Sequence, residues 1–299
     1  MRRILALPLA ASLILAFTLV GVPAAAVAAV ADECEPVASE HGTSARGDDQ
    51  IKEPEINEPA EELPATAKGK GAGVTATVPV WFHVVSLDGK TGNVSDAQIA
   101  AQMRVMNLAF SGEYGGVDTG FRWVLAGVTR TTNAEWYYAG PGSPAERDMK
   151  KALTIGAPKA LNWYSTTAGP YLGWAYFPGL TPSRMFLDGI VVDWESMLRT
   201  SDRYEDRYDL GLTAVHEAGH WLGLHHTFNG GCNNNGDYVD DTPPMRIPTR
   251  GCPIGKDTCP EPGVDPIHNY MDYSYDSCYF EFTAGQTARM ADHFAHFRR

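Results

Sequence analysis

Residues 216–226 carry histidines and a glutamate at spacings that suit a catalytic metal site. His216 and His220 lie four residues apart, so on a helix they project from one face, one turn apart. Two imidazoles in that arrangement can bind one Zn²⁺ at about 2.0–2.1 Å. Glu217 directly follows the first histidine, where a carboxylate can hold and deprotonate a zinc-bound water.

The residues after this pair supply a third ligand. Gly223 suits a helix C-terminus, because the chain must there enter a left-handed conformation. The turn it permits brings His226 back to the metal, and three protein ligands leave one position open, as a catalytic zinc requires. His225 neighbours that ligand but faces elsewhere, so we expect it to lie outside the site.

The long motif resembles the metzincin signature, which includes a later Met-turn. The stretches 216–226, 230–232, 236–242 and 269–274 are similar, more narrowly, to the pappalysin (cytophagalysin-type) metzincins. The resemblance is densest after residue 210. It implies a secreted zinc endopeptidase that acts on proteins or peptides, and we expect a monomer.

The same resemblance assigns further site residues. Met271 is implied to form a hydrophobic floor beneath the three histidines without binding metal. Tyr273 is implied to place its phenol near the zinc, where it can donate a hydrogen bond to the oxyanion. A packed aromatic residue is the alternative interpretation of Tyr273.

Two residues are implied to contact substrate. Asp276 follows the Met-turn and is implied to select arginine or lysine after the cleaved bond (P1′); a solvated loop aspartate is the alternative. Residues 173–176 resemble the edge strand that pairs with extended substrate, so Trp174 is expected to contact it. An ordinary edge strand is the alternative there.

Five cysteines are present, and four of them follow the metal motif. Four cysteines allow three pairings. The resemblance implies disulfides Cys232–Cys259 and Cys252–Cys278. The fifth, Cys34, could occupy the open zinc position and keep a zymogen latent, with cleavage at residues 45–46 releasing it.

The loop 236–242 concentrates oxygen ligands around a glycine, as Ca²⁺ prefers. Asp237, Asp241 and Thr242 are the predicted calcium ligands, and pappalysin relatives can bind calcium near this region. The spacing is not that of an EF-hand, and an ordinary Asx-turn loop is the alternative.

The chain divides into three segments. Residues 1–31 carry two arginines, an apolar run and small residues, which predicts a cleaved signal peptide; a retained membrane anchor is the alternative. Residues 32–73 are polar and rich in Glu, Pro, Ala and Gly, and we expect a flexible pro-segment or linker. Residues 74–299 are long enough for one catalytic domain. The net charge of −12 argues against a nucleic-acid partner.

Hydrophobic patterning predicts the remaining elements. Strands are expected at 74–85, 121–131, 160–166, 172–177 and 189–194, and helices at 95–110, 144–155 and 283–297. His83, inside the first strand, is expected to be a hydrogen-bonded core histidine. The fold class is α+β with an α/β-type N-terminal subdomain: a metzincin-like domain with a mixed twisted sheet, an active-site helix and an irregular, disulfide-linked C-terminal subdomain.

The sequence therefore favours a secreted zinc metalloendopeptidase with Glu217 as general base and acid. A non-catalytic exported module that keeps zinc for structure is the alternative from another class. A zinc hydrolase of small amides or esters is a second alternative, which the extended cleft disfavours.

Overall fold

A computed structural model describes residues 63–233 and 236–299. In chain order its elements, with η for a 3₁₀ helix, are β1 (Ala76–Ser86), α1 (Asp96–Phe110), β2 (Phe121–Thr132), α2 (Ala134–Tyr137), α3 (Pro144–Leu153), β3 (Leu161–Thr166), β4 (Gly173–Ala175), η1 (Pro182–Leu187), β5 (Ile190–Asp193), η2 (Trp194–Ser196), α4 (Thr213–Trp221), η3 (Asp276–Cys278) and α5 (Ala284–Phe297). The predicted signal peptide, Cys34 and the cleavage site at 45–46 lie outside the described residues.

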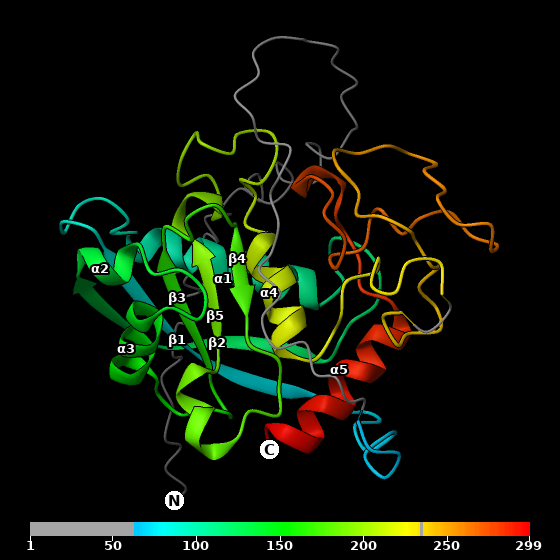
Figure 1. The fold of residues 1–299 in the computed structure, drawn as a ribbon, viewed down its shortest axis with the longest axis horizontal. Coiled ribbons are helices and arrows are strands. Elements are labelled where there is room, and N and C mark those ends of the chain that lie inside the picture. Colours follow the sequence, from blue (N-terminus) through cyan, green and yellow to red (C-terminus); the bar gives the residue numbers. More distant parts are fainter. Residues whose placement is uncertain (1–62, 234–235) are drawn as a thin grey trace, which may run out of the picture. The chain divides into compact units, whose positions relative to one another are not determined.

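The described strands form a five-stranded sheet in the order β2-β1-β3-β5-β4. Strand β1 pairs in parallel with β2 and β3, and β3 pairs in parallel with β5. Strand β4 runs antiparallel to β5 and forms one edge, beside α4 (Figure 1). The predicted mixed sheet is therefore confirmed, with the strand expected at 172–177 at its edge.

Alternate strand residues face two hydrophobic cores, because side chains of a strand point to opposite faces in turn. Phe82, Trp163 and Val192 belong to the larger core, together with residues of α1, α4 and α5. Tyr164 and Val191 belong to the smaller core, together with residues of α2 and α3. Both faces of the sheet are covered, as parallel strands require, and α4 packs on the face of the larger core.

Capping residues fix the starts of two helices where the sequence predicts them. The Ser95 N–H donates to Gln98 Oε1 (2.8 Å), and the Gln98 N–H donates to Ser95 Oγ (3.3 Å), ahead of α1. Thr283 and Gln286 form the same reciprocal box ahead of α5. These bonds satisfy amide groups that the first helical turn leaves without a partner in the helix.

The C-terminal end of α4 is capped by Arg298. Its guanidinium is buried and donates to the Trp221 carbonyl from Nε (3.0 Å) and Nη2 (2.6 Å). A positive charge at this end complements the helix dipole. Asp188 neutralises the buried charge, with Oδ1 at 3.1 Å from Arg298 Nη1, and accepts a bond from Trp221 Nε1 (3.0 Å). This network fixes the point at which the chain leaves the active-site helix.

Residues 63–73 differ from the flexible segment that their composition predicts. They form turns on α5, where the amides of Gly69 and Gly71 each donate to the Asp292 carboxylate at 2.6 Å. Leu63 and Ala67 are buried. Packed structure therefore begins before Val74. The Asp292 carboxylate on the last helix binds backbone amides of this segment, and local composition does not reveal such a distant contact.

The chain between α4 and α5 consists mainly of loops and turns, as predicted. Disulfides join Cys232 to Cys259 and Cys252 to Cys278, which are the pairs that the resemblance implies. Within the described ranges, no helix has both the length and the apolar character that crossing a membrane requires.

Candidate metal centre

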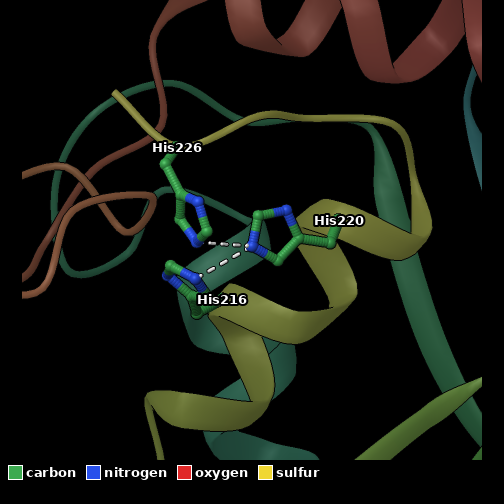
Figure 2. A group of neighbouring side chains, drawn as sticks. All are labelled: His216, His220 and His226. Carbon is green, nitrogen blue, oxygen red and sulfur yellow. Dashed lines mark hydrogen bonds between the residues drawn. The ribbon is translucent and has the colours of Figure 1, made fainter. Parts of the chain in front are cut away.

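Helix α4 places His216 and His220 on one face, and both are buried. Their Nε2 atoms lie 3.0 Å apart. After Leu222 the chain turns through Gly223, whose φ is +97°, and the Leu224 N–H donates to the Gly219 carbonyl (3.0 Å). That turn brings the Nε2 atom of His226 to 3.0 Å from that of His220. Figure 2 shows the three rings converging from the helix and the following loop.

Gly223 is required on two grounds. Its left-handed backbone conformation is one that other residues rarely adopt. In addition, a Cβ atom there would lie 2.5 Å from the ring of His293, a buried histidine on α5. Arg289 of the same helix donates from Nε to the Gly223 carbonyl at 2.8 Å. The turn that supplies the third histidine is thus held by α5.

Backbone carbonyls orient two of the rings. His216 Nδ1 lies 2.5 Å from the Tyr270 carbonyl, and His220 Nδ1 lies 2.7 Å from the Leu224 carbonyl. A carbonyl can only accept, so each Nδ1 carries a proton, and Nε2 is the ring nitrogen whose lone pair is available to a metal. Lone pairs that face one another at 3.0 Å repel unless a cation lies between them. Tetrahedral zinc would hold such nitrogens about 3.3 Å apart, so the donor set fits this metal.

The Glu217 side chain is fully buried beside this cluster. Strand β4 approaches its carboxylate so closely that a Cβ atom at Gly173 would lie 2.7 Å from Oε1. The same Cβ would lie 2.7 Å from the carbonyl oxygen of Val191 on β5. Only glycine fits at this point, and the sheet edge therefore contacts the acid directly.

The turn that contains Met271 lies directly against α4. Met271 is fully buried, and a Cβ atom at Gly219 would lie 2.5 Å from its sulfur. The Met271 N–H donates to Asn269 Oδ1 (3.0 Å), and Asn269 exchanges two hydrogen bonds with Gln286 at the start of α5. This turn also provides the Tyr270 carbonyl that orients His216.

The hydroxyl of Tyr273 lies 3.2 Å from Nε2 of His226. Its ring contacts those of His226 and Phe228 with centroid distances of 5.0 and 4.8 Å. The phenol oxygen of Tyr273 therefore lies beside the group of three imidazole nitrogens, nearest to that of His226.

A pocket opens beside His216, with two buried carboxylates in its wall. Its lining residues are Leu172, Tyr208, Thr213, His216, Pro248, Thr249, Arg250, Asp272, Tyr273, Asp276 and Tyr279. The Cys252–Cys278 disulfide joins the segments around 248–250 and 272–279, which supply most of the lining residues.

Both carboxylates in this pocket carry raised pKa values. Asp276 accepts the amides of Leu210 (2.9 Å) and Leu212 (3.4 Å) on Oδ2, which also fixes the loop ahead of α4. Burial raises the pKa of Asp276 to about 7. Asp272, which the sequence analysis missed, accepts the Thr249 amide (3.0 Å), and burial raises its pKa as well. Its place between Met271 and Tyr273 was the available signal.

The Trp174 side chain does not face the metal site, so the predicted substrate contact of this residue falls to its backbone and stays a prediction. Trp174 is 1% exposed and lies in the smaller core, on the opposite face of the sheet from α4. Its Nε1 donates to Glu146 Oε1 at 2.8 Å. Alternation along β4 explains the difference, since Gly173 and Ala175 take the face toward α4. What remains of the prediction is the backbone of the strand.

The residues predicted to bind calcium have other contacts. Thr242 Oγ1 donates to Asp237 Oδ2 at 2.5 Å. Asp241 accepts bonds from Thr283 Oγ1 (2.6 Å) and the Gly285 amide (2.8 Å) at the start of α5. Calcium binding would have to replace these bonds, and it stays a prediction.

Two further histidines lie apart from the cluster. His225 is buried against the rings of Phe177 and Tyr238. His83 is buried in β1 with Thr129 Oγ1 at 2.8 Å and Asn162 Oδ1 at 3.0 Å from its two ring nitrogens. Burial lowers its pKa to about 4, so it is a neutral, hydrogen-bonded core histidine, as expected.

The proteins to which this chain is similar are metalloproteases. The sequence profile of the peptidase family described as pregnancy-associated plasma protein-A matches residues 172–295. An extracellular metalloprotease of Pyricularia oryzae is 48% identical over 228 residues, covering 74% of this chain and 76% of that protein. Extracellular metalloprotease 1 of Coccidioides posadasii is 43% identical over 257 residues, covering 83% and 88%.

The solved structures include a similar fold. Mature mirolysin of Tannerella forsythia, in complex with a cleaved peptide, superposes with a TM-score of 0.62 at 31% identity. The match covers 73% of this chain and 91% of that structure.

Proposed function

The chain belongs to the pappalysin family of metalloproteases, and on that premise we propose that it cleaves peptide bonds with a zinc ion held by His216, His220 and His226. The observation that carries the proposal is the inward convergence of the three Nε2 atoms, two of them fixed by carbonyls on Nδ1. The names of the relatives support an extracellular location. Cleavage after residue 31 stays a prediction.

Glu217 is proposed as the general base and acid. When bound, zinc supplies Lewis acidity, which makes water a nucleophile near pH ~7 and polarises a carbonyl. Glu217 takes the proton of the attacking water and passes it to the leaving amine. Its burial against Gly173 supports this role, because a carboxylate held rigidly beside the metal site loses little freedom in the transition state.

Tyr273 is proposed to assist the same step. Its hydroxyl lies 3.2 Å from Nε2 of His226, so it can donate to a substrate oxygen that is held beside the three histidines. The donated bond strengthens as that oxygen gains negative charge, which is what lowers the barrier. Met271 supports α4 from below and takes no part in proton transfer.

The backbone of β4 is proposed to bind the substrate chain. The strand is at the sheet edge, one face of it contacts Glu217, and its outer edge can pair with an extended peptide. A peptide added there would lie next to the metal site. Mature mirolysin, a structural relative, was solved in complex with a cleaved peptide, which supports peptide binding by this fold.

The pocket beside His216 is proposed to receive the P1′ side chain. Asp276 and Asp272 give it acidic character, which favours arginine or lysine there. Arg250 lines the same pocket and brings a positive charge to it. Burial, with a smaller contribution from the charge of Asp209, raises the pKa of Asp276 to about 7. The net charge of the pocket therefore changes with pH near neutrality.

The preference for arginine over leucine at P1′ is expected to rise about fivefold or more between pH ~6 and ~8. The pKa of Asp276 is about 7, so this carboxyl gains its negative charge across that interval and attracts a guanidinium more strongly. Two peptides that differ only at P1′ measure the ratio of kcat/KM, in which the shared pH dependence of the zinc chemistry cancels. The Asp276→Asn variant should flatten the ratio. A ratio that favours leucine at every pH would eliminate the acidic pocket as the selector.

Proteolysis by the purified protein tests the function itself. Casein and a peptide library are expected to be cleaved, with products identified by mass spectrometry. Phenanthroline should abolish cleavage, and one equivalent of Zn²⁺ per chain should restore it, because three protein ligands hold the metal. A chain that binds one zinc and cleaves nothing would instead be the non-catalytic binding module.

A further inference from the structure

Helix α3 carries a buried ion pair on the side of the sheet that faces the smaller core. Glu146 and Lys150 lie one turn apart, and both side chains are 0% exposed. Lys150 Nζ is 3.2 Å from Glu146 Oε1. A buried pair of this kind is seldom more stable than hydrophobic residues of the same volume. Stability alone therefore does not account for the pair, and its contacts indicate another role.

The Glu146 carboxylate binds the underside of β4. Its Oε1 accepts from Trp174 Nε1 (2.8 Å), and its Oε2 accepts from the Tyr176 hydroxyl (2.9 Å) and the Gly142 amide (2.6 Å). Trp174 lies in β4 and Tyr176 directly follows it, and both side chains belong to the smaller core. The Glu146 carboxylate thus binds the Trp174 and Tyr176 side chains, both of which lie in the smaller core.

Lys150 fixes the carboxylate from the other side. Its Nζ donates to the Leu187 carbonyl at 2.9 Å and lies 4.2 Å from the centroid of the Tyr176 ring. Burial alone would raise the pKa of Glu146, but Lys150 and the Trp174, Gly142 and Tyr176 donors hold it below the usual value. The carboxylate is therefore ionised at neutral pH and makes strong, charge-assisted bonds.

Strand β4 needs such an anchor. It is only three residues long and pairs with a single neighbour, β5. On its upper face Gly173 touches Glu217, with no room for a Cβ atom between them. Figure 1 shows β4 at the sheet edge beside α4. A small shift of this strand would change both its pairing edge and its contact with the acid.

We propose that the buried Glu146–Lys150 pair is a positioning device, which holds β4 in place for pairing with the substrate chain next to Glu217. The inference rests on the proposed function, since it takes β4 as the strand that binds substrate. Neither residue touches the substrate. They act through Trp174 and Tyr176, so their removal should weaken use of the substrate residues that pair with β4. We take these to be the residues before the cleaved bond, because the pocket beside His216 is assigned to the residue after it.

The test compares two peptides with the same residues after the cleaved bond. One has four residues before that bond, and the other has a single blocked residue. In the Glu146→Gln/Lys150→Met variant, which removes both charges together, the long-to-short ratio of kcat/KM should fall about tenfold, because displaced binding elements lose oriented contacts. Tyr176→Phe removes one bond to Glu146 and keeps the ring, so it should lower the ratio by about threefold if the double variant does not fold.

Met149→Ala is the matched control. Met149 lies on α3, is fully buried in the same core, and makes none of the four bonds to the carboxylate. It should lower the thermal unfolding midpoint and leave the ratio within about twofold, because a cavity weakens the fold without removing the anchor. An unchanged ratio in the double variant or in Tyr176→Phe would overturn the inference. A wild-type enzyme that gains nothing from the longer peptide would overturn the role of β4, while chelator-sensitive cleavage still upheld the protease.

Discussion

The Glu217→Gln variant is expected to lose about a thousandfold or more of kcat while it keeps its zinc and its fold, because positioned general acid–base groups contribute roughly 10²–10⁴-fold. Glutamine has nearly the same shape, so it fits the buried position against Gly173. It cannot take the proton of the attacking water. Steady-state cleavage of one defined peptide, with metal content from mass spectrometry and the unfolding midpoint from a thermal scan, measures the three properties together.

A second variant distinguishes the base from a merely polar residue. Glu217→Asp keeps the carboxylate but withdraws it by one methylene, so it should lose about a hundredfold, between the wild type and Glu217→Gln. Both variants should bind one zinc per chain, because their three histidines are unchanged. Activity in Glu217→Gln above about a tenth of the wild type would show that another group accepts the proton.

The metal motif could be read from the sequence because its geometry is local. His216, His220 and Glu217 share one short helix, and the backbone conformation of Gly223 marks the turn to His226, although the contacts of that turn with α5 could not be read locally. Helix starts were equally accessible, since Ser95 and Thr283 meet their capping partners three residues later. Each of these features depends on contacts within a few residues, where spacing and geometry are nearly equivalent.

The features that sequence reasoning missed depend on contacts between distant segments. The carboxylate of Glu146 meets Trp174 and Tyr176, which lie 28 and 30 residues away, and no local pattern marks that meeting. The amides of Gly69 and Gly71 bind Asp292 across most of the chain. Such contacts can be recognised only when the three-dimensional arrangement of the helices and strands is known.

The orientation of the Trp174 side chain follows from the alternation of residues along β4. Residues 173–176 alternate small and large side chains, and a strand with period two places Gly173 and Ala175 on one face. The small residues lie toward α4, where the Glu217 carboxylate leaves no space. The large residues occupy the core below, where Glu146 accepts their polar hydrogens. The substrate prediction concerns the backbone of the strand, which stays at the sheet edge although the Trp174 side chain occupies the smaller core.

Of the neighbouring substitutions His226→Ala and His225→Ala, only the first is expected to remove the metal. His226 Nε2 lies 3.0 Å from that of His220, so its loss leaves two ligands, and the variant should lose zinc on dialysis and at least about a thousandfold of activity. His225 contacts Phe177 and Tyr238 instead. Its removal should lower the unfolding midpoint while one zinc per chain and most of the activity remain.

Comparing the two variants is informative because His225 and His226 are adjacent residues on the turn after Gly223. A general loss of structure at this turn would affect both variants equally, whereas a ligand role affects one. The ring of His226 also stacks on Phe228, with a centroid distance of 4.7 Å, so His226→Gln is a useful third variant that keeps some of this packing without the imidazole. It should lose zinc like His226→Ala. Zinc retained in both His226 variants and lost in His225→Ala would mean that the chain presents the other histidine to the metal, and the turn at Gly223 would then have to follow a different path.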